Sequence, residues 1–129
     1  MRYLIDTSSI GRAIADDTLR LRRAISNLGI DQIGASVMTI VEIEYGLARH
    51  RVRRAKVVRE LLGCFRPVEF GEADAATAGS LRAQLQAVGT PIGLMDTMIA
   101  AQALTRGLIV ITHDTADFAR VPRLRVVGI

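Results

Sequence analysis

Residues 108–114 read Leu-Ile-Val-Ile-Thr-His-Asp, and this stretch decides the fold class. An unbroken apolar run that ends in a polar turn is typical of a strand buried on both faces, as in a parallel sheet. Shorter strands are expected at residues 1–5, 32–35, 66–70 and 124–127. Pro67 indicates that its strand starts or borders a sheet.

Segments with helical spacing separate these strands. We expect helices over residues 10–15, 19–28, 37–49, 52–62, 72–87 and 96–105. Ser8 or Ser9 can cap the first helix and Ser36 the third, while Gly29 and Gly107 close two others. Strands that alternate with helices predict an α/β fold, with a parallel sheet covered on both faces.

Length and composition predict a single domain spanning residues 1–129. Half of the residues are apolar, which is enough for a real core, whereas aromatic residues make up only 4% and Trp is absent. Scarce rings argue against recognition of nucleic acid mainly by base stacking. The net charge is +4, from sixteen Arg and one Lys against thirteen acids. A basic exterior suits a polyanionic substrate, but solubility and Arg-rich codon usage explain it equally well.

The sequence also indicates a compartment. The one cysteine, Cys64, cannot form an internal disulfide, and its apolar neighbours predict a buried thiol. Asp6 interrupts the first apolar run, so no signal peptide is expected. No apolar stretch approaches the roughly 20 residues needed to span a bilayer. We expect a cytoplasmic protein with no membrane association.

Acidic residues recur where a predicted strand ends or a helix begins, at Asp6, Glu42, Asp96 and Asp114. These junctions open on one edge of a parallel sheet, which is where ligands bind. Carboxylates gathered in a small space require a counter-charge, and hard divalent cations prefer such oxygen ligands. The pattern predicts a Mg²⁺- or Mn²⁺-dependent enzyme that acts on a phosphate ester.

Each acid also has a plain structural explanation. Asp6 and Asp96 can be helix N-terminal residues that interact with the helix dipole. Helical spacing does not choose between Glu42 and Glu44. The fourth acid is Asp114 or Asp117, either of which can be a turn residue or a cap. Two neighbours complete the set: Thr112 can hold a carboxylate or a metal-bound water, and His113 is expected in a solvated loop.

Four motifs carry a resemblance to a known family. They are residues 4–8 (Leu-Ile-Asp-Thr-Ser), 36–46 (with Ser36, Thr39, Glu42 and Gly46), 92–101 (around Asp96) and 110–118 (with Asp114 and Asp117 before Phe118). In this order and spacing they resemble the PIN-domain ribonucleases, specifically the VapC toxins of bacterial toxin–antitoxin pairs. The likeness covers nearly the whole chain and selects Glu42 over Glu44. Leu94 departs from the pattern, since Pro is frequent there.

The resemblance implies a three-layer α/β/α sandwich with a central, mainly parallel sheet. It implies that Asp6, Glu42, Asp96 and Asp114 bind one or two Mg²⁺ or Mn²⁺ ions for hydrolysis of an RNA phosphodiester. Supporting residues around them are Thr7, Ser8, Thr112 and Asp117. It also implies a VapB-like antitoxin, a homodimer and a toxin–antitoxin hetero-oligomer.

A basic segment offers contacts for phosphates at Arg51, Arg53 and Arg54. The segment also has an apolar stripe at helical spacing, so the solvated face of an amphipathic helix explains these arginines slightly better than phosphate binding does.

Three other functions share some of these sequence features. An aspartyl phosphatase needs a second Asp two residues after Asp6, where Ser8 stands. A phosphorylation receiver needs a Lys at the end of a late strand, but the only Lys is Lys56. A PIN-like module that binds RNA or a partner without cutting remains the alternative, and the intact carboxylates argue against it.

Overall fold

The computed structural model describes residues 1–15, 18–50 and 53–129. Five parallel strands form its sheet, in the order β3-β2-β1-β4-β5. The strands are β1 (Tyr3–Ile5), β2 (Ile33–Ser36), β3 (Arg66–Val68), β4 (Ile109–Thr112) and β5 (Val126–Gly128). The predicted parallel sheet is thus confirmed, and Pro67 lies in an edge strand, where its missing N–H costs no ladder hydrogen bond.

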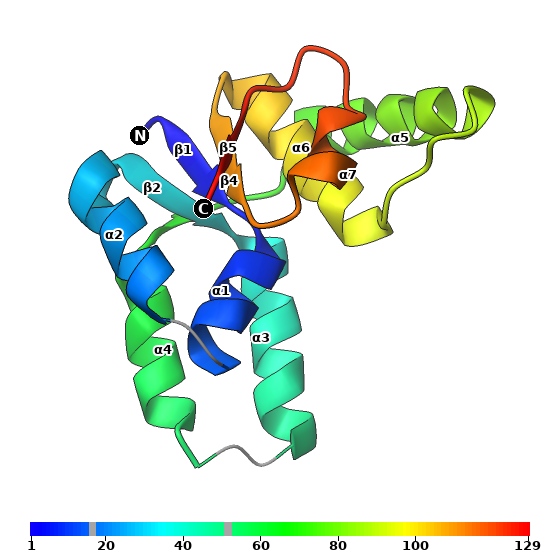
Figure 1. The fold of residues 1–129 in the computed structure, drawn as a ribbon. Helices are drawn as coiled ribbons and strands as arrows, with labels where there is room; N and C mark the ends of the chain where they lie inside the picture. The colour runs from blue at the N-terminus through cyan, green and yellow to red at the C-terminus, as the bar shows by residue number, and fades with distance from the viewer. Residues whose placement is uncertain (16–17, 51–52) are drawn as a thin grey trace.

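Helices cover both faces of the sheet (Figure 1). They are α1 (Thr7–Ala15), α2 (Thr18–Leu28), α3 (Val37–His50), α4 (Ala55–Gly63), α5 (Glu72–Ala87), α6 (Leu94–Arg106) and α7 (Thr115–Ala119), with a short 3-10 helix, η1, at Ile30–Gln32. The long helix at 72–87 has the predicted bounds. The basic helix begins at Ala55, later than expected, and α6 begins two residues earlier than expected. None of the helices in these ranges is long and apolar enough to cross a bilayer.

Two hydrophobic cores lie on opposite faces of the sheet, because neighbouring residues of a strand point to opposite sides. Leu4 and Val110 pack with α5, α6 and α7, in a core that includes Leu85, Ile99 and Phe118. Ile5 and Ile111, the next residues along the same strands, pack with α1 and α2. These central strands therefore read as continuous apolar runs, and their carboxyl ends are rigidly placed.

The helix ends show which capping predictions hold. Ser36 Oγ accepts a hydrogen bond from the N–H of Met38 at 3.0 Å, as expected for the cap of α3. Gly29 and Gly107 have φ of 88° and 65°, left-handed values that favour glycine after a helix. The predicted Ser8 or Ser9 cap of the first helix is wrong. Helix α1 starts at Thr7, and Asp6 Oδ1 accepts from the N–H of Ser9 at 3.0 Å.

Cys64 also differs from expectation, because its side chain is exposed. It follows the last residue of α4, where the chain turns toward β3, and its thiol donates to the Glu60 carbonyl at 3.4 Å. Phe65 enters the core in its place. Apolar neighbours in sequence do not bury a residue that lies in an exposed turn at the end of a helix.

Candidate active site

Asp6 is the centre of the carboxyl edge of the sheet. It directly follows β1, the middle strand, and is only 1% exposed. Its Oδ2 accepts from the hydroxyls of Ser8 at 2.8 Å and Thr112 at 2.7 Å, and its Oδ1 accepts from the Ser9 N–H. These three donors leave about one of the four lone-pair sites of the carboxylate open. Among the described residues no Lys, Arg or His forms an ion pair with Asp6.

The hydroxyl of Thr112 links two of the expected site residues. It donates to Asp6 and accepts from the N–H of Asp114 at 2.8 Å. The expectation that Thr112 holds a carboxylate is therefore confirmed. Ser9, which the sequence indicated only as a possible cap, is fully buried, and its hydroxyl accepts from the His113 N–H at 3.0 Å. These bonds lock the turn after β4 onto the start of α1.

The pKa of Asp96 depends on the charges of the other acids. It lies in the first turn of α6, where the helix dipole favours a carboxylate. Nevertheless its pKa is raised to about 6, first by burial and then by the negative charges of Asp6, Asp117, Asp114 and Glu42, in that order. Residues from four separate elements are thus close enough to repel one another, as the sequence predicted.

Helical spacing did not choose between Glu42 and Glu44, but their contacts in the structure differ. Glu44 is bound in two hydrogen bonds by Arg59 of α4, at 2.8 and 2.9 Å, and this contact lowers its pKa. Glu42 is exposed, and its charge reaches Asp96. Glu44 therefore ties α3 to α4, whereas Glu42 faces the acidic cluster.

Asp114 and Asp117 form a pair. Asp114 caps α7 by accepting from the N–H of Asp117 at 3.3 Å. Contact with Asp114, together with burial, raises the pKa of Asp117, while Arg120 opposes the shift from 3.5 Å. Arg120, which the sequence analysis did not single out, stands three residues after Asp117, a spacing that places both on one face of a helix. Asp117 is half-buried and Asp114 exposed.

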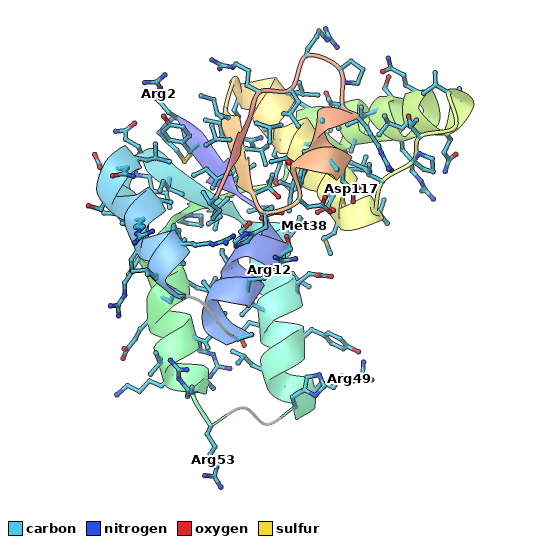
Figure 2. The ribbon with its side chains drawn as sticks, viewed as in Figure 1. Arg2, Arg12, Met38, Arg49, Arg53 and Asp117 are labelled. Atoms are coloured by element: carbon cyan, nitrogen blue, oxygen red, sulfur yellow. The ribbon has the colours of Figure 1, made fainter. Side chains whose placement is uncertain are left out.

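The structure gives other expected residues different contacts or positions. Thr7 shares a hydrogen bond with the buried Thr39, at 2.9 Å between their hydroxyl oxygens, and so joins α1 to α3. Arg53 and Arg54 are exposed in the turn before α4. Figure 2 shows Arg53 at the far end of the α3–α4 hairpin from Asp117. Arg51 lies outside the described residues, so a role of these arginines in RNA binding stays a prediction.

The cluster is rich in oxygen ligands and poor in counter-charge. Within residues 1–15, 18–50 and 53–129, no three His, Cys, Asp or Glu side chains form a group tight enough to hold a metal ion as they stand. The chemistry of the donors nevertheless fits a hard divalent cation, because carboxylate oxygens are its preferred ligands. Such an ion would relieve the repulsion that raises the pKa of Asp96.

Comparisons with known proteins identify the family of this chain. A family model for the PIN domain matches residues 3–124. The tRNA(fMet)-specific endonuclease VapC of Salmonella typhimurium is 29% identical over 98% of this chain and 96% of its own length. The protein of the same name from Shigella flexneri is 30% identical, over 97% and 96%. The crystal structure of DNA-bound VapBC from Salmonella typhimurium contains a similar chain, with a TM-score of 0.88 and 27% identity over 99% of this chain and 98% of that one. This chain therefore belongs to the PIN-domain family and, within it, to the VapC-type ribonucleases.

Proposed function

We propose that this protein is a divalent-metal-dependent endoribonuclease and the toxin of a VapBC-type pair. The feature that carries the proposal is the acidic cluster at the carboxyl edge of the sheet, where burial and then the charges of four other carboxylates raise the pKa of Asp96. Two similar proteins are named as tRNA(fMet)-specific endonucleases, so we propose tRNA as the first substrate class to test.

Asp6, Glu42, Asp96 and Asp114 are the proposed metal ligands, directly or through water, for Mg²⁺ or Mn²⁺. When bound, the cation lowers the pKa of a coordinated water and so supplies a nucleophile near neutral pH. Ser8 and Thr112 hold Oδ2 of Asp6 in a fixed orientation. Since two hydroxyls and one amide already bind this carboxylate, little reorganisation is needed when it takes a ligand position.

Asp117 competes with Asp114 for the fourth position. The charge of Asp117 raises the pKa of Asp96 more than the charge of Asp114 does. Asp114 is also already engaged as the cap of α7. We propose that the two carboxylates act as a pair, with the positive charge of Arg120 partly balancing the negative charge of Asp117.

A VapB-like antitoxin and a second copy of this chain are the proposed partners. Large apolar side chains are exposed beside the acids: Val41 and Tyr45 flank Glu42 on α3, and Leu94 opens α6. They offer a surface for a protein that covers the site. A similar chain occurs in a structure titled as a VapBC complex, which supports the same assignment. We further propose that residues 1–129 act as a single domain in the cytoplasm.

Cleavage of total cellular RNA and total tRNA by purified, antitoxin-free protein tests the proposal. We expect discrete fragments with Mg²⁺ or Mn²⁺, none with EDTA, and none from Asp6→Asn. Glu42→Gln and Glu44→Gln are a matched pair on one helix, because each removes one negative charge. Glu42→Gln should lose cleavage by about 100-fold, whereas Glu44→Gln should keep it. Tight RNA binding without cleavage by folded, metal-loaded protein would instead support the non-cleaving module.

A further inference from the structure

Two adjoining hollows lie between α5, α6 and the loop after α7. Their volumes are about 320 and 380 Å³. Both are lined by Thr77, Leu104 and Arg123, the first also by Ser80 and Gln84. No Asp or Glu lines either hollow, although acids dominate the site at the carboxyl edge.

The polar lining is arranged on one face of α5. Thr77, Ser80 and Gln84 are spaced i, i+3 and i+7, which places them in a single stripe along the helix. Across the described part of the chain, no hydrogen bond or ion pair to protein occupies their side chains or the guanidinium of Arg123. The nearby Asp74 is already bound by Arg106, so it does not neutralise Arg123.

Arg123 also has an unusual backbone. Its φ is 66°, the only positive value at a non-glycine position in the described residues. The N–H of Leu124 bonds to the carbonyl of Val121 at 3.4 Å, which puts Pro122 and Arg123 at the two central positions of a turn. A positive φ at the second of these normally selects Gly or Asn. Turn geometry therefore does not account for an arginine at this position.

We propose that Arg123 and the Thr77–Ser80–Gln84 stripe bind a phosphate of the backbone of the RNA substrate, away from the bond that is cut. A guanidinium with several neutral donors, in a hollow that no acid lines, is the chemistry that recognises a phosphate. This inference rests on the proposed ribonuclease function and adds a substrate contact to it.

The position of Arg123 suits a strand that is already bound at the acidic cluster. It follows Asp117 by only six residues, so the hollow lies within about 20 Å of that residue, the span of a few nucleotides. Arg120, between them, is already committed, because it pairs with Asp117 and donates to the Pro91 carbonyl at 3.1 Å. Arg125, just before β5, donates to the Gly107 carbonyl at 2.9 Å. Among the described residues of this loop, Arg123 is therefore the cation that is left for a ligand.

RNA binding is measured without cleavage, as the anisotropy of fluorescein-labelled total tRNA in EDTA over a range of salt concentrations. The variants are Arg123→Asn and Arg123→Gly, which suit the positive φ but lack the charge, and Arg123→Lys, which keeps the charge. Arg22→Gln on α2, across the sheet, is the control for a general loss of positive charge, since Arg22 is also exposed.

For Arg123→Asn we expect a Tm equal to or above that of the parent protein, and a Kd about five- to tenfold higher near 0.1 M salt. The slope of log Kd against log salt should fall by about 1. Arg123→Gly should behave alike, and Arg123→Lys should recover most of the affinity. Parent-like binding by Arg123→Asn, or an equal loss in Arg22→Gln, would overturn the inference.

Failure of the inference and failure of the proposed function are distinguishable. The same tRNA is incubated with parent protein and Mn²⁺. If the parent protein binds and cuts it while Arg123→Asn binds equally well, only the phosphate contact is refuted. If the folded parent protein neither binds nor cuts any RNA, both the proposed function and the proposed phosphate contact are refuted.

Discussion

Replacement of Thr112 by Val tests how the acidic site is held together. Valine keeps the shape of threonine but removes the hydroxyl, which is fully buried. Two hydrogen bonds are lost: the one to Asp6 Oδ2 at 2.7 Å and the one from the Asp114 N–H at 2.8 Å. A bond to a charged group contributes about 1.5–3 kcal/mol, and an amide left without a partner costs about 1 kcal/mol when it is only partly buried.

Thr112→Val should therefore lower the free energy of unfolding by about 2–4 kcal/mol. For a domain of this size the melting temperature should fall by about 10 °C. Urea unfolding at pH 7 in EDTA, followed by far-UV circular dichroism, measures the change. Thr112→Ser is the control, because it keeps the hydroxyl and loses one methyl group, at a cost of about 1 kcal/mol.

RNA cleavage gives a second readout of the same substitution. An Asp6 carboxylate that has lost a supporting donor should reduce metal affinity or activity by about 10- to 100-fold. The reasoning is refuted if Thr112→Val is as stable as the parent protein, or if Thr112→Ser is destabilised as much as Thr112→Val. Either result would mean that the hydroxyl does not orient Asp6.

Three further predictions concern charge. Asp6→Asn should lower the pKa of Asp96 from its value of about 6, because the charge of Asp6 is the largest of the four that raise it; carboxyl NMR titration of metal-free protein measures this. Since the folded state keeps a proton on Asp96 that the unfolded chain has lost, metal-free protein should lose about 2–3 kcal/mol of stability as pH rises from about 4 to about 6. Mn²⁺ should restore stability at pH 7. Urea midpoints across this range check both, and Asp96→Asn should show a much smaller loss, to which the raised pKa of Asp117 still contributes. Asp74 has the opposite sign: Arg106 lowers its pKa to about 2, so it contributes about 2 kcal/mol that is present above pH 4 and lost as pH falls toward 2. Arg106→Met should remove most of that acid-dependent loss in the same measurement, since Thr105 and the Gly71 N–H also lower the pKa of Asp74. A profile unchanged from the parent protein would contradict the assignment.

Local patterns predicted most of the elements. The apolar run before His113 identified β4, and Gly107 marked the end of the helix before it, because a left-handed residue there favours glycine. The sequence left the cap of the first helix open for a physical reason. Asp6, Ser8 and Ser9 are all good capping residues, and only the path of the chain decides that Asp6 caps while the two serines bind other groups.

The sequence by itself determined the alternation of strands and helices, the parallel sheet and the positions of acids at the ends of its elements. Those properties depend on periodicity and on residues that start or stop a helix, which are local. The tertiary structure decided which acids face one another. Glu44 is bound by Arg59, fifteen residues away, and Asp6 is held by Thr112, more than a hundred residues away. Such pairings arise from packing against the two cores, so they can be read only when the chain is folded.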